Sequence, residues 1–73
     1  PDYVFEPNYE LMSFDELREY LENNKHLPGI PSASETEENG INLSEMNMML
    51  LQKVEEMTLY ILELEQRISE IEK

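Results

Sequence analysis

The residues of this 73-residue chain that could carry out chemistry are few. Cysteine is absent, which excludes disulfides and thiolate metal sites, and His26 is the single histidine. A histidine acts as a base or a metal ligand only beside a nucleophile or further ligands, and the sequence pattern supplies neither for His26. We therefore interpret His26 as structural. The sequence predicts no enzymatic activity, no catalytic, cofactor-binding or metal-binding residue, and no cofactor.

Carboxylates are abundant, and they restrict the partners that the chain can bind. The sequence has 17 acidic and 5 basic residues, for a net charge of −12. Clustered carboxylates can bind calcium, but no loop here has the aspartate-rich pattern with a closing glutamate that calcium loops need. Nucleic acids and anionic membranes attract basic surfaces, so neither is expected as a partner. No stretch is apolar enough to span a membrane.

The most informative spacing is apolar and lies in the last third of the chain. Apolar residues alternate four and three positions apart without a break: Leu50, Val54, Met57, Ile61, Leu64, Ile68 and Ile71. This heptad is the seam of a left-handed coiled coil, because such residues stay on one face of an underwound helix. No other segment is long enough to supply a partner helix. The expected partners are copies of the same chain.

Polar residues at seam and flanking positions predict how these copies associate. Asn47 falls at a seam position, where a buried amide fixes the register. Arg67 and Glu72 flank the seam in the arginine–glutamate pattern of short parallel trimeric coiled coils, in which they face each other across adjacent chains. We therefore predict a parallel homotrimer. The predicted association residues are Leu43, Asn47, Leu50, Val54, Met57, Ile61, Leu64, Arg67, Ile68, Ile71 and Glu72.

Helix starts are marked by capping boxes, in which a serine or asparagine precedes a glutamate by three positions. The predicted starts are Ser13 with Glu16 for a helix over about 14–24, Ser34 with Glu37 for about 35–39, and Asn42 with Glu45 for the long helix from about Leu43.

The remaining segments are predicted to be non-helical. Residues 2–12 contain aromatic and β-branched residues around a Pro-Asn pair, which predicts an extended segment with one or two short strands. Residues 26–32 form a connector with two prolines, in which Gly29 suits a positive φ and Leu27 and Ile30 are expected to anchor a small core.

A second apolar stripe on the long helix predicts how these parts pack. Met48, Leu51, Leu59 and Leu62 lie outside the seam, where a bare coiled coil would expose them. We predict that the N-terminal region forms a collar that buries Leu59 and Leu62, from its own or a neighbouring chain. The expected fold is mainly α, with a collar of a short extended segment and one or two short helices on a long helix that forms a parallel trimeric coiled coil. The expected units are residues 1–42 and 43–73.

Nearly the whole chain resembles the C-terminal module of fibrous surface and tail-fibre-like proteins from Bacteroidetes and their phages. The segments DYVFEP, HLPGIPSA, NGINL and EEMTLYILEL carry the resemblance. It implies a structural module at the end of a β-rich fibre shaft, extracellular on a phage tail fibre or a bacterial surface. Many such proteins are grouped with tail fibres that end in an endosialidase-type intramolecular chaperone, a trimeric module that cuts itself free with a serine and a lysine. No equivalent pair matches here, because Ser13 is explained as a helix cap.

These observations together favour a non-enzymatic trimerisation and assembly module whose partners are itself and the upstream fibre shaft. Two alternatives stay open. One is a receptor-binding fibre tip that uses the aromatic N-terminal part. The other is a self-cleaving chaperone whose catalytic pair lies upstream of this segment.

Overall fold

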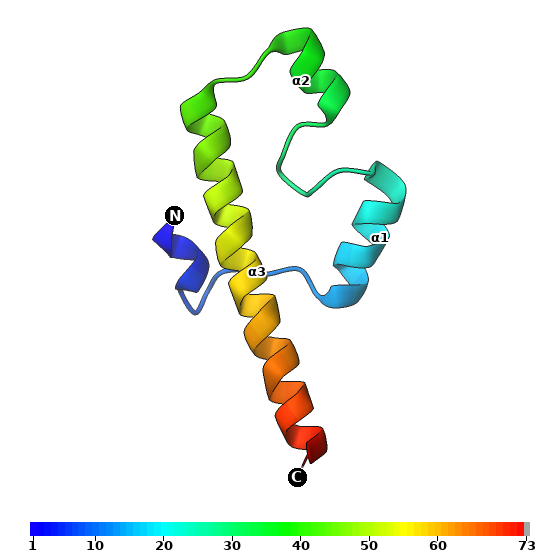
Figure 1. Ribbon diagram of the computed structural model, residues 1–73, viewed down its shortest axis with the longest axis vertical. Helices are drawn as coiled ribbons and strands as arrows, with labels where there is room; N and C mark the ends of the chain where they lie inside the picture. The colour runs from blue at the N-terminus through cyan, green and yellow to red at the C-terminus, as the bar shows by residue number, and fades with distance from the viewer. Residues whose placement is uncertain (73) are drawn as a thin grey trace.

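The chain is mainly helical, as the sequence predicts. The computed structural model describes residues 1–72. Its elements are the 3-10 helix η1 (Asp2–Phe5) and the helices α1 (Phe14–Asn24), α2 (Ala33–Asn39) and α3 (Leu43–Glu72), with no strand among the described residues. Figure 1 shows that η1 lies on one side of α3 and that α1 and α2 lie on the other.

The long helix α3 sets the shape of the molecule. Its 30 residues span about 45 Å at the rise of an α-helix, against overall extents of 51 × 28 × 19 Å. The helix starts at Leu43, as predicted, and the Glu45 amide donates to Asn42 Oδ1 at 3.1 Å. The reciprocal bond of the predicted capping box is not among the hydrogen bonds of residues 1–72.

Helix α1 has both the bounds and the cap that the sequence predicts. The Glu16 amide donates to Ser13 Oγ at 3.1 Å, and the Ser13 amide donates to the Glu16 carboxylate at 3.0 Å. The bond from the Ser13 amide is the main cause that lowers the pKa of Glu16, because it stabilises the charged form. The helix ends before Lys25, which adopts a left-handed φ of 58° and donates its amide to the Leu21 carbonyl.

The prediction of an extended segment over residues 2–12 is wrong for its first residues. Residues 2–5 form η1, in which the Val4 amide donates to the Pro1 carbonyl at 3.3 Å. A strand needs a partner to satisfy its backbone, and residues 1–72 offer none, so the backbone closes local bonds instead. Val4 is only 1% exposed, and η1 packs on α3. The backbone then turns at Pro7 and Asn8, where the Tyr9 amide donates to the Glu6 carbonyl at 3.0 Å.

The predicted cap of α2 is also wrong. Ser32, not Ser34, is the N-cap: its hydroxyl accepts from the Glu35 amide at 3.2 Å, and α2 starts at Ala33. Both serines precede a glutamate by three positions, so the capping-box pattern cannot choose between them. The earlier start is favoured because it adds helical hydrogen bonds at no loss of a cap. Gly40 follows the helix with a φ of 69°.

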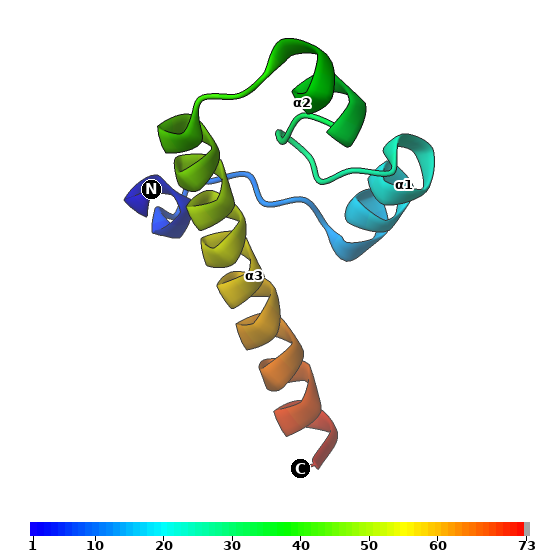
Figure 2. The same cartoon turned by 45° about the horizontal axis from the view of Figure 1, so that its top comes forward.

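The connector between α1 and α2 turns at Pro28 and Gly29. The Ile30 amide donates to the Leu27 carbonyl at 3.2 Å, and Gly29 has a φ of 78°, as the third residue of a type II turn requires. The expected core anchors behave differently from each other, because Ile30 is partly buried while Leu27 is 43% exposed. The prediction for Leu27 is therefore wrong within a single chain. The turn leaves α1 and α2 on the same side of α3 (Figure 2).

The caps give a matched test of α1. Ser13→Ala removes a side-chain cap and should reduce the stability of α1 by about 1 kcal/mol. Amide hydrogen exchange should then be about fivefold faster in α1. Ser34→Ala is the control, because Ser34 caps no helix. Equal effects of the two substitutions on their own helices would contradict the assignment of the caps.

Candidate association surface

The N-terminal segment binds to α3 through polar contacts in the middle of the helix. The Tyr9 hydroxyl donates to the Glu56 carboxylate and accepts from Gln52 Nε2 at 3.0 Å. Lys53 Nζ binds the same carboxylate at 2.9 Å, and Pro1 lies beside Glu55.

The start of α1 is held by aromatic packing further along α3. The rings of Phe14 and Tyr60 lie 5.1 Å apart, and the Tyr60 hydroxyl donates to the Met12 carbonyl at 2.9 Å. The Arg67 guanidinium lies 5.0 Å from the centre of the Phe14 ring, on its face. Near the connector, Gly29 lies beside the side chain of Lys53. A Cβ atom at position 29 would be 3.8 Å from Lys53 Nζ.

In heptad notation, with Asn47 at position a and Leu50 at position d, these contacts all fall away from the seam. Pro1 reaches position b, Tyr9 reaches c and f, and Phe14 and Gly29 reach position g. Figure 1 shows the same course, in which the chain passes from η1 across α3 to α1. The N-terminal region thus occupies the back of α3 and its g flank, and it reaches the b flank at Glu55.

The seam itself is left uncovered. Its residues are all exposed, and the exposed fractions of the apolar ones run from 46% for Leu50 and Leu64 to 84% for Ile71. Asn47 is exposed at the same face. The exposed apolar seam residues are Leu43, Leu50, Val54, Met57, Ile61, Leu64, Ile68 and Ile71. Exposed apolar faces of this length are typical of association surfaces.

The C-terminal part of the seam is grooved. An open groove of about 340 Å³ runs between the side chains of Ile61, Leu64 and Ile68, with Glu65, Ser69 and Glu72 along its rim. Apolar side chains from a second helix can fill such a groove as knobs fill holes. The polar rim provides hydrogen-bonding and charged groups at its edge.

The predicted collar is present only in part. Leu59 is partly buried, but Leu62 is 57% exposed, so the prediction that both are buried is wrong for Leu62 within one chain. The reason is that the N-terminal segment reaches position b only at Glu55, beside Pro1, and Leu62 lies at b two helical turns later. Met48 and Leu51, at b and e, are exposed as well.

Arg67 and Glu72 are not in contact within the chain. Arg67 Nη2 instead binds Glu63 Oε1 at 2.9 Å, one turn earlier, while Glu72 is exposed at the end of α3. Glu63 and Arg67 are both about half exposed, so the bond between them is weak. It leaves Arg67 accessible to a neighbouring chain.

Burial changes the acidity of the two tyrosines that hold the N-terminal segment. Burial, followed by the hydrogen bond to Glu56, raises the pKa of Tyr9 above its ordinary value of 10.0. Burial, followed by the negative charges of Glu56 and Glu63, raises the pKa of Tyr60. Both effects favour the neutral hydroxyl, which is the form that donates a hydrogen bond.

Other kinds of site find no support among residues 1–72. These residues contain no group of three or more histidine or acidic side chains that could hold a metal ion. None of their helices combines the length and apolar character needed to cross a membrane. No family model, curated protein or solved structure matches the chain.

The sequence did not reveal the contacts on the back of α3. Tyr9 and Tyr60 pair with residues 43 to 48 positions away, and heptad periodicity carries no information on such pairs. A usable signal was the placement of aromatic and long polar side chains, such as Gln52 and Tyr60, at outer positions of a coiled coil.

The tyrosines predict a stability that falls at high pH. A raised pKa in the folded state gives stability that is full below pH 10 and is lost as the pH rises through the folded-state pKa. The melting temperature should therefore fall above pH 10, and Tyr60→Phe should reduce this fall. Tyr20→Phe is the control, because the Tyr20 ring lies against His26 and it is the Tyr60 hydroxyl that binds the Met12 carbonyl. A pH dependence that Tyr60→Phe leaves unchanged would contradict the assignment.

Proposed function

We propose that the chain is the C-terminal trimerisation and assembly module of a fibrous, tail-fibre-like or cell-surface protein, without enzymatic activity. One observation carries the proposal: the rest of the chain contacts the back and one flank of α3 and leaves its apolar seam uncovered. Burying a large aliphatic side chain stabilises by about 1.5–3 kcal/mol, so three joined seams form a substantial core. Copies of the chain are the partners that fit a regular heptad.

Flanking charges support a parallel arrangement. In a parallel coil, position g of one chain faces position e of its neighbour. Arg67 at g and Glu72 at e are the one such pair in this sequence that joins opposite charges. Arg67 is paired with Glu72 five positions further on, where its planar fork matches a carboxylate and its stem covers the seam. The arginine–glutamate pattern favours three chains.

The assembly would serve the fibre that precedes the module. Joining three C-termini raises the effective concentration of the upstream strands for one another. Long-range pairing between strands is otherwise slow, because the chains must close large loops before contacts form. The module thus registers the three chains of a shaft. The setting is extracellular, on a phage tail fibre or a bacterial surface.

A receptor-binding fibre tip is the second candidate, because two aromatic residues of η1 face solvent. Tyr3 and Phe5 are 52% and 51% exposed. Exposed aromatic side chains are common anchors of binding surfaces. The two functions are separable: Tyr3→Ser and Phe5→Ser together should leave the oligomeric state unchanged and should abolish attachment to host cells only if η1 is a tip.

A charge in the seam tests the proposed function. Ile61→Asp places a carboxylate where three chains meet and should cost at least about 2 kcal/mol per chain. Sedimentation equilibrium at tens of micromolar should then give the monomer mass, while circular dichroism reports a lower helix content. Gln66→Asp is the matched control, because Gln66 is exposed outside the seam. If Ile61→Asp leaves the mass and melting temperature of the unaltered chain, α3 does not associate through this seam.

A second pair of substitutions tests the contact that sets stoichiometry. Glu72→Gln removes the proposed partner of Arg67 in a neighbouring chain, and Glu63→Gln removes its partner within the chain. Both remove one charge, so the net charge changes equally. Glu72→Gln should lower the melting temperature and allow dimers to form, and Glu63→Gln should not. The reverse ranking would show that Arg67 serves only its own chain.

A further inference from the structure

The apolar residues of α3 outside the seam divide into two groups by position. Those at c, f and g are partly buried by the chain's own N-terminal region: Met46, Met49, Leu59 and Tyr60. Those at b and e, on the other flank, are exposed: Met48, Leu51 and Leu62. The g flank of the helix is therefore covered within the chain, whereas the b and e flank is covered only at Glu55, beside Pro1.

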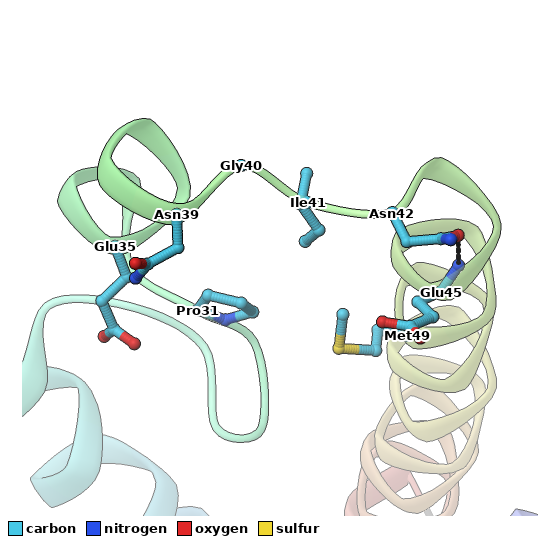
Figure 3. A pocket seen from close by; sticks show the side chains of 8 residues that line it. All are labelled: Pro31, Glu35, Asn39, Gly40, Ile41, Asn42, Glu45 and Met49. Carbon is cyan, nitrogen blue, oxygen red and sulfur yellow. Dashed lines mark hydrogen bonds between the residues drawn. The ribbon is translucent and has the colours of Figure 1, made fainter.

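A corresponding set of uncovered residues lies on the segment of residues 14–41, named the arm here. Leu21, Leu27 and Ile41 are 37%, 43% and 37% exposed. The arm does not close onto its own helix. A hollow of about 440 Å³ separates the end of α2 from the start of α3, and Pro31, Ile41 and Met49 line it (Figure 3).

The arm is attached at position g of α3. Phe14 contacts Tyr60 and Arg67, and Gly29 lies beside Lys53, and these three α3 residues all occupy g. In a parallel coil the g flank of one chain adjoins the e flank of the next. An arm fixed on the g flank therefore overhangs the e and b positions of its neighbour.

We propose that the arm of each chain packs on the exposed part of the b and e flank of the next chain's α3, covering Leu51 and Leu62 on either side of Glu55. The occupant of this flank is thus a second copy of the chain. The arm spans α3 from the level of Lys53, beside Gly29, to that of Arg67, beside Phe14. Leu62 falls within that span, and Leu51 lies two residues before Lys53. The exposed apolar residues of the arm thus cover those on the neighbouring α3. Each chain places its collar on the next chain around the trimer. This inference rests on the proposed function, because it requires parallel chains.

Cysteine cross-linking tests the inference on the full chain, which has no cysteine of its own. Chains with Leu27→Cys are refolded with an equal amount of chains with Leu51→Cys, one of them tagged, and oxidised. Leu21→Cys with Leu62→Cys is a second pair. Since each chain holds one cysteine, every disulfide joins two chains. Circular dichroism checks that each variant is folded.

Two controls separate this inference from the proposed function. Leu27→Cys with Gln66→Cys pairs the arm with an exposed position outside the flank. Ile71→Cys alone places a cysteine in the seam, where parallel chains cross-link to one another. At least one of the two arm pairs should give about tenfold more mixed disulfide than the Gln66 control, because a docked contact raises the effective concentration.

The outcomes are distinct. Cross-linked Ile71→Cys with a mixed arm disulfide above the control supports the inference. Cross-linked Ile71→Cys with neither arm pair above the control overturns it, while the proposed trimer stands. Failure of Ile71→Cys to cross-link overturns both.

Discussion

The structure depends on one constraint: a 30-residue amphipathic helix that its own chain cannot cover. Helices in water gain most of their stability from packing of the apolar face. The N-terminal region supplies packing on the back of α3, through Tyr9, Phe14 and Tyr60. The contact between the Phe14 ring and Arg67 is where this packing ends. Beyond Arg67, the seam of the helix still carries the exposed residues Ile68 and Ile71. The proposed self-association would supply the missing packing along the whole length.

The side of α3 that each contact uses explains how folding and the proposed assembly would coexist. Contacts within the chain take positions b, c, f and g, so they do not compete with positions a and d. The tyrosines give this arrangement specificity, because the hydroxyls of Tyr9 and Tyr60 have fixed partners in Glu56 and Met12. A chain can therefore dock its N-terminal segment before or after it meets other copies. Arg67 would serve both folding and the proposed assembly, because it binds Glu63 and Phe14 within its own chain and remains about half exposed.

Local patterns made half of this fold predictable. The bounds of α1 and the start of α3 follow from capping residues and periodicity, which act within a few positions. The helical form of η1 was missed because strand propensity is overruled when no partner strand is present and Val4 packs on α3. The cap of α2 was misplaced because Ser32 and Ser34 satisfy the same pattern. The seam was predictable from spacing, whereas the exposure of Leu62 depends on which flank a distant segment covers.

The proposed trimer requires three seams to close on one another. Sedimentation equilibrium of the unaltered chain at tens of micromolar distinguishes this trimer from a monomer, because the measured mass does not depend on molecular shape. If three seams close, the mass measured at high loading concentration is three times 8.7 kDa. A mass of 8.7 kDa that persists to hundreds of micromolar would show that α3 does not associate through its seam.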